Sequence, residues 1–201
     1  KYSIDTFIFS CNVFTTNKKR AKEIANLIID NNLNIKYSIN DRVGTYDKNL
    51  AELLAKSGCY EVRVGIEAVD PKVQKILNKP WDIEKVKEQF KIIHDAGIRI
   101  QSYFTTGVPG ESKKSLKMNA KFISDVDADT FSASPLFIMP GSRLYHQLKA
   151  ENKMLTMDWH KYHDFKELVY VNETYDNIEA ILAAEVYMKR KVYQYNILRF
   201  D

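Results

Sequence analysis

The stretch YEVRVGIEAVDPKVQ, residues 60–74, places a short apolar run directly before a glutamate. Val62, Val64 and Ile66 make the run typical of a buried strand. An ionised carboxylate is costly to bury unless it is paired or hydrogen-bonded, so Glu67 must reach water, a cation or a ligand. The segments on both sides of this stretch indicate which fold presents the carboxylate.

Helical and strand-like segments alternate along the chain in both directions from this stretch. Before it, Asp47 is placed to cap a helix that Gly58 ends in a left-handed conformation. Further helices are predicted to begin near Asn17, Asp82 and Ser112. Strand patterns occupy five segments: residues 3–9, 35–40, 60–67, 98–106 and 130–140.

Repeated strand–helix units predict parallel strands joined by right-handed crossovers. The fold class is therefore α/β, either a doubly wound sheet or a complete or partial barrel. In both architectures, chemistry collects at the carboxyl ends of the strands. The segments that follow the strands should share this rim: Asn40 and Arg42, Glu67, TGVPGES at residues 106–112, and MPGSR at residues 139–143.

The alternating pattern stops near Tyr145. Residues 1–145 are predicted to form the α/β unit, and residues 146–201 a C-terminal helical extension. The long helix of this extension is expected at about residues 177–195.

Composition limits the classes of function. A length of 201 residues with 45% hydrophobic content suits one domain, or one domain with an appendage. A formal net charge of +4 without a dense basic run gives little support to nucleic-acid or membrane binding. The two cysteines are far apart, which indicates a reducing compartment, and no signal sequence or membrane-spanning run is apparent. We therefore expect a cytoplasmic protein.

Three patterns that resemble metal or nucleophile sites have simpler interpretations. DVDAD, residues 125–129, is followed by Thr130 where a calcium loop needs glycine. His160 and His163 have no evident third ligand. Cys59 lies next to no histidine and reads as a small buried apolar residue. No metal site is predicted within the chain.

Five segments, taken in order, resemble the radical S-adenosylmethionine superfamily. They are FSCNVFTTNKKRAKEI, SINDRV, LLAKSGCYEVRVGIEAVDPKV, AGIRIQSYFTTGVPGES and PLFIMPGSRLYHQLK. The chain is most similar to the branch whose members often carry an N-terminal cobalamin-binding domain. The segments match that branch's second to sixth strands and cover most of the chain. The resemblance therefore implies a partial parallel (β/α) barrel that lacks its first strand.

In that superfamily, a CxxxCxxC motif after the first strand binds a 4Fe-4S cluster. This chain lacks the motif, because neither Cys11 nor Cys59 lies in that spacing. The resemblance implies a parent enzyme whose cluster, bound by ligands outside this chain, cleaves S-adenosylmethionine to a 5′-deoxyadenosyl radical. It also allows a cobalamin in the parent. We expect the chain itself to be an inactive core fragment.

The resemblance assigns cofactor-binding roles at two strand ends. Glu67 matches the polar residue after the fourth strand that typically hydrogen-bonds the ribose hydroxyls of S-adenosylmethionine. Gly65 would let the backbone approach the cofactor closely. Asn40 and Arg42 are placed to bind the methionine carboxylate, to which arginine offers a planar two-donor fork.

The next loop receives looser assignments from the same resemblance. Gly107, Pro109 and Gly110 would shape this loop near the adenine or methionyl group, and Met139 would pack on the adenine. Taken alone, the glycines and proline are also explained as a turn into the helix capped by Ser112. The resemblance identifies no catalytic residue.

One departure from the branch supports a second hypothesis. Relatives commonly carry two aspartates after the second strand, where this chain has Cys11 and Asn12. The exchange indicates either a different substrate or a degenerate relative. In the second case the chain would be a non-catalytic barrel that acts as a binding or scaffold domain, with Glu67 solvated or paired with Arg63.

The segment SIDTFIF, residues 3–9, is expected to leave an open sheet edge of unpaired backbone groups. We expect this edge to permit dimerisation. The substrate, a small molecule or another class, stays open, because substrate contacts would come from rim loops that vary freely on this fold.

Overall fold

The computed structural model describes residues 4–126, 128–162 and 166–197, so Asp127 and His163 lie outside the described residues. Its strands are β1 (Thr6–Phe9), β2 (Lys36–Asp41), β3 (Cys59–Glu67), β4 (Arg99–Thr106) and β5 (Thr130–Pro135). Its α-helices are α1 (Lys18–Asp30), α2 (Lys48–Lys56), α3 (Pro71–Leu77), α4 (Ile83–Asp95), α5 (Lys113–Asp125), α6 (Arg143–Ala150) and α7 (Ile178–Ile197). None of the helices described is long and apolar enough to cross a membrane.

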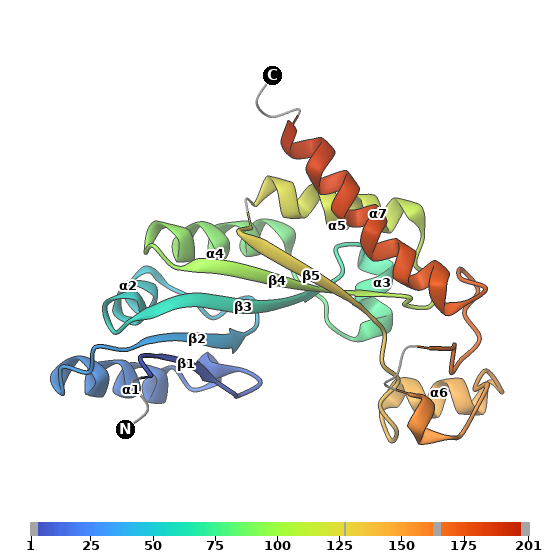
Figure 1. Ribbon diagram of the computed structural model, residues 1–201, viewed down its shortest axis with the longest axis horizontal. Helices are drawn as coiled ribbons and strands as arrows, with labels where there is room; N and C mark the ends of the chain where they lie inside the picture. Colours follow the sequence, from blue (N-terminus) through green and yellow to red (C-terminus); the bar gives the residue numbers. More distant parts are fainter. Residues whose placement is uncertain (1–3, 127, 163–165, 198–201) are drawn as a thin grey trace. The chain divides into compact units, whose positions relative to one another are not determined.

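The strands form one five-stranded sheet in the order β1-β2-β3-β4-β5 (Figure 1). Strands β1 and β2 pair in parallel from Thr6 opposite Lys36 to Phe9 opposite Ile39. Strands β2 and β3 also pair in parallel, with a register irregularity after Tyr37. The predicted α/β class is confirmed.

The chain divides into two compact units. The first unit contains residues 1–66, 81–103 and 125–132, and therefore β1, β2, α1, α2 and α4. The second unit contains residues 67–80, 104–124 and 133–201, and therefore α3, α5, α6 and α7. The carboxyl ends of β3, β4 and β5 belong to the second unit. The predicted division after residue 145 falls within α6 and stays a prediction.

The helices of the first unit begin where the sequence predicted, each after a capping side chain. Asn17 accepts from the backbone N–H of Arg20, and Asp47 accepts from that of Leu50. Asp82 likewise caps α4. Each cap satisfies a backbone donor that the helix leaves unpaired. These helices bury apolar faces, and the buried apolar residues of α1, α2 and α4 include Ala21, Ala25, Ile28, Leu50, Leu54, Val86, Phe90 and Ile93.

Gly58 makes the tight connection from α2 to β3. Its φ is +99°, and a Cβ at this position would lie 2.1 Å from the carbonyl oxygen of Ile35. Its own carbonyl oxygen accepts from the N–H of Tyr37. Only glycine fits both the left-handed conformation and the close backbone approach. The predicted helix end at Gly58 is confirmed.

The second unit contains two apolar clusters. One consists of Ala68, Val73 and Val108. It packs α3, which carries Val73, against the loop after β4, which carries Val108. The other consists of Ile138, Tyr145, Leu148, Tyr162, Val169 and Tyr170. Helices α5 and α7 lie together, with the Ser124 hydroxyl bonded to Asn196 Oδ1 at 2.8 Å (Figure 1).

Two elements differ from the sequence predictions. The short helix α3 was not predicted, although Asp70 caps it and Pro71 occupies its first turn. The strand predicted over residues 130–140 ends at Pro135, which has no N–H to donate to a neighbouring strand. After this strand, Ile138 is buried in the apolar cluster that also contains Tyr145 and Tyr170.

Candidate functional site

Glu67 ends β3 in an unusual backbone conformation with both carboxylate oxygens occupied. Its φ is +65°, a region that non-glycine residues rarely adopt. One oxygen accepts from Lys79 Nζ at 2.7 Å, and the other from the Thr105 hydroxyl at 2.7 Å. The side chain retains 21% of its exposure. The carboxylate is thus paired with a cation and still reaches solvent.

The alternative partner considered for Glu67 was wrong. Arg63 bonds Glu61 instead, with 2.9 Å between Arg63 Nε and Glu61 Oε1. The cation that pairs with Glu67 comes from α3, whose end is a left-handed Asn78 that is followed directly by Lys79. Because sequence reasoning missed α3, it also missed Lys79.

The loop after β4 has two left-handed glycines and a buried centre. Gly107 and Gly110 both have a φ of +77°. Val108 is fully buried, whereas Pro109 is half-buried and Gly110 is exposed. The N–H of Gly107 donates to Glu111 Oε2 at 2.9 Å. The turn that the sequence predicted is therefore held by a carboxylate that sequence reasoning did not single out.

The polar end of β2 belongs to the first unit. Asn40 is half-buried and Arg42 is exposed, and neither side chain has a polar partner among the residues described. Between them, Asp41 is buried and accepts from the Thr15 N–H and hydroxyl, the Arg42 N–H and the Tyr46 hydroxyl. Sequence reasoning missed Asp41, which fixes the chain beside both predicted site residues.

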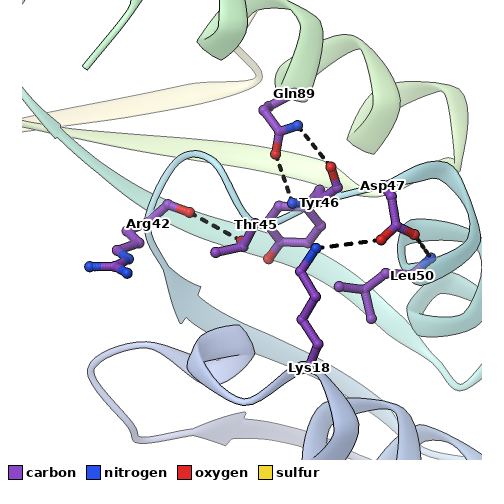
Figure 2. Close-up of polar contacts among 7 residues, drawn as sticks. All are labelled: Lys18, Arg42, Thr45, Tyr46, Asp47, Leu50 and Gln89. Atoms are coloured by element: carbon purple, nitrogen blue, oxygen red, sulfur yellow. Dashed lines mark hydrogen bonds and ion pairs between the residues drawn. The ribbon is translucent and has the colours of Figure 1, made fainter.

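The loop that follows Arg42 is braced by α4 (Figure 2). Gln89 accepts from the Tyr46 N–H at 2.7 Å and donates to the Tyr46 carbonyl oxygen at 2.8 Å. Burial, with the nearby Asp41 carboxylate as a second cause, raises the pKa of Tyr46 well above its ordinary value. Figure 2 shows the Arg42 guanidinium directed away from these bonds. The Arg42 guanidinium is therefore exposed, while the backbone at Arg42 is held by the Asp41 and Thr45 side chains.

Two further predicted site residues, Gly65 and Met139, lie within β3 and after β5. Gly65 is half-buried within β3, two residues before Glu67. Met139 follows β5 and is 60% exposed. The roles assigned to these residues, like those of Asn40 and Arg42, stay predictions.

The residues present fit S-adenosylmethionine better than they fit an iron–sulfur cluster. Glu67 presents partly exposed carboxylate oxygens, which can accept ribose hydroxyls, and Thr105, which bonds it, precedes the glycine loop by two residues. A cluster needs several thiolates. Cys11 and Cys59 are the only cysteines, and burial raises the pKa of the Cys59 thiol to about 12. This chain therefore does not supply a cluster site.

Comparison with known proteins agrees with this arrangement. A family model for the Radical SAM superfamily matches residues 1–123. An uncharacterised methyltransferase of Pyrococcus horikoshii is 30% identical over 81% of this chain and 35% of that protein. Bacteriochlorophyllide d C-12(1)-methyltransferase of Chlorobaculum tepidum is 25% identical over 81% of this chain and 35% of that protein. The chain spans about a third of the length of these relatives.

Solved structures give the same fold. The radical S-adenosylmethionine methyltransferase TsrM of Kitasatospora setae, with cobalamin and a 4Fe-4S cluster bound, superposes with a TM-score of 0.67. It is 17% identical, and the match covers 73% of this chain and 31% of that chain. Coproporphyrinogen III oxidase of Escherichia coli, a radical SAM enzyme, has a TM-score of 0.62 at 15% identity over 71% of this chain and 34% of that chain. The predicted partial barrel is confirmed as the fold, and the chain belongs to the Radical SAM superfamily.

Proposed function

We propose that this chain is the S-adenosylmethionine-binding core of a radical SAM enzyme. The observation that carries the proposal is Glu67, which is held at the end of β3 by Lys79 and Thr105. Each of its oxygens has a second lone pair that can accept a ribose hydroxyl. Its strained backbone is the kind of feature that functional sites retain.

The glycine loop after β4 completes this part of the site. Residues 107–110 follow β4 directly, and Thr105 on the same strand bonds Glu67. The loop would line the adenine or methionyl part of the cofactor, while Glu67 orients the ribose. When bound, S-adenosylmethionine would supply the group that is cleaved or transferred.

The chemistry of the whole protein belongs to the same proposal. A 4Fe-4S cluster bound by ligands outside these 201 residues would reduce the cofactor, so the isolated chain would bind S-adenosylmethionine without cleaving it. Relatives named as methyltransferases favour methyl transfer as the reaction class, and the cobalamin in TsrM favours cobalamin as a second cofactor.

Equilibrium binding of S-adenosylhomocysteine, measured by isothermal titration calorimetry, tests the cofactor site. This probe keeps the adenosine and cannot be cleaved at a sulfonium. We expect Glu67→Gln to weaken binding by about 10-fold, the cost of a charge-assisted hydrogen bond. The matched control is Glu52→Gln on the exposed face of α2, which should leave the affinity unchanged. If the unmodified chain binds no probe at millimolar concentration, the scaffold hypothesis is favoured instead.

A further inference from the structure

The loop at residues 107–111 is held from one side by Glu111, which is 2% exposed. Its Oε2 accepts from the Gly107 N–H at 2.9 Å and from the Tyr175 hydroxyl at 2.6 Å. Its Oε1 has no hydrogen-bond partner among the residues that the structure describes. Both of these donors are neutral groups, a backbone N–H and a hydroxyl.

A segment far along the chain bonds the same loop. We call residues 170–175 the strap. The Tyr170 hydroxyl and the Asn172 amide both donate to the Gly107 carbonyl oxygen, the amide at 2.6 Å. The Thr174 hydroxyl donates to the Glu111 carbonyl oxygen at 2.7 Å. The strap therefore contacts both ends of the loop through side chains.

The strap is itself ordered by short-range bonds. Asn172 Oδ1 accepts from the N–H groups of Thr174 and Tyr175, at 2.9 and 3.2 Å. This turn directs the Tyr175 ring toward Glu111 while the Asn172 amide remains on Gly107. Helix α7 adds a steric limit, because a Cβ on Gly107 would lie 2.8 Å from Ile181 Cδ1. The conformation of the loop thus depends on residues that lie at least 63 positions away in sequence from the loop residues that they bond.

Burying a carboxyl group and several polar side chains is costly, and an apolar contact would stabilise the unit at less cost. Hydrogen bonds differ from apolar contacts in fixing direction. Here they fix the N–H and the carbonyl of Gly107. Without these bonds, a glycine could adopt many backbone conformations besides the left-handed one seen here. The arrangement sets the shape of the loop before any ligand arrives.

We propose that the strap is a positioning element that pre-forms the cofactor loop, with Tyr175 acting through Glu111 and Tyr170 acting directly on Gly107. The inference rests on the proposed function of that loop. A pre-formed loop loses less conformational entropy than a mobile loop when the cofactor binds, so its affinity for the cofactor is higher. Tyr170 and Tyr175 are positioning residues and need not touch the cofactor.

The test compares Tyr175→Phe with Tyr193→Phe. The first variant removes only the hydroxyl that bonds Glu111, and the second removes one from a tyrosine that is 68% exposed on α7. Two readouts are taken at a temperature where thermal melts show both variants folded: hydrogen exchange of residues 107–111 and affinity for S-adenosylhomocysteine. We expect Tyr175→Phe to speed exchange in the loop and to weaken binding about 3- to 10-fold, with Tyr193→Phe within twofold of the unmodified chain.

Tyr170→Phe is the second variant, in case Tyr175→Phe does not fold, and the same two changes are expected. Unchanged affinity in a folded strap variant overturns the proposal, even if its melting temperature falls, because the strap is then structural only. Failure of the unmodified chain to bind the probe overturns the proposed function and this inference with it. If instead all variants bind the probe as tightly as the unmodified chain, only the inference about the strap is overturned and the proposed function stands.

Discussion

At the residue scale, two glutamates of the second unit show how a carboxylate can be retained near an apolar core. Glu67 is partly exposed and pairs with a cation, Lys79. Glu111 is buried and is bonded by Tyr175 and the Gly107 N–H. Burial is the main cause that raises the pKa of Glu111, to about 7, and the two hydrogen bonds oppose it.

Glu111 should make the stability of the protein depend on pH. An unfolded glutamate loses its proton near pH 4.5, whereas the folded protein keeps it until about pH 7. The contribution of Glu111 is therefore fully present below about pH 4.5 and is lost as the pH rises through 7, a change of about 3 kcal/mol. Glu111→Gln cannot ionise, so its urea-unfolding free energy should fall less between pH 5 and 8 than that of the unmodified chain. Equal pH slopes would contradict the assignment, and Glu52→Gln serves as the control.

Gly107 should be less replaceable than a glycine of similar backbone conformation. Gly97 has a φ of +79° and open space where a Cβ would lie, whereas Gly107 has a φ of +77° and faces Ile181. Gly97→Ala should cost about 1 to 2 kcal/mol from backbone strain alone. Gly107→Ala should cost at least about 1 kcal/mol more, because overpacking adds to the strain. Chemical denaturation of both variants measures the loss of unfolding free energy. Equal losses would contradict the prediction and show that the Ile181 side chain moves aside without cost.

At the element scale, the loop between β2 and α2 depends on a side chain of α4. Gln89 bonds both backbone groups of Tyr46, and Asp47 caps α2 directly afterwards (Figure 2). Gln89→Ala leaves a backbone donor and acceptor of a largely buried residue unpaired. We expect it to cost about 1 to 3 kcal/mol of unfolding free energy and to speed hydrogen exchange in residues 42–47. Gln147→Ala, which removes an exposed amide on α6, should change neither. Unchanged exchange in the loop would show that α4 does not hold it.

Local signals explain which elements could be predicted from the sequence. Asp47 and Asp82 cap helices through bonds to residues two or three positions away, so their role is visible in sequence. Helix α3 has only seven residues, too few for a helical period to show, although its Asp-Pro start was a usable signal.

The tertiary partners of the site were not predictable in the same way. Thr105 lies 38 positions from Glu67, and Tyr175 lies 64 positions from Glu111. No periodicity or spacing rule joins residues at such separations. The strand ends that carry Glu67 and the glycine loop followed from the alternation of strands and helices, but the side chains that orient them required the folded structure.

At the scale of the whole molecule, β1 is an edge strand with exposed apolar side chains. Phe7 and Ile8 are 42% and 57% exposed. Unpaired backbone groups beside apolar side chains favour pairing with another strand. We predict that the hydrodynamic radius of the chain increases with concentration, and that Ile8→Lys reduces this increase. A radius that is constant across concentrations in sedimentation velocity would count against self-association.

Family membership and the Glu67 site lead to one central proposal about the whole protein, that Glu67 helps to bind S-adenosylmethionine for cluster chemistry. The most direct test is an electron paramagnetic resonance spectrum of the whole protein after anaerobic cluster reconstitution and reduction. The account predicts about four or more irons per chain and a reduced-cluster signal that changes when S-adenosylmethionine is added, with a smaller change in Glu67→Gln. Absence of a cluster, or a signal that S-adenosylmethionine does not alter, would contradict it.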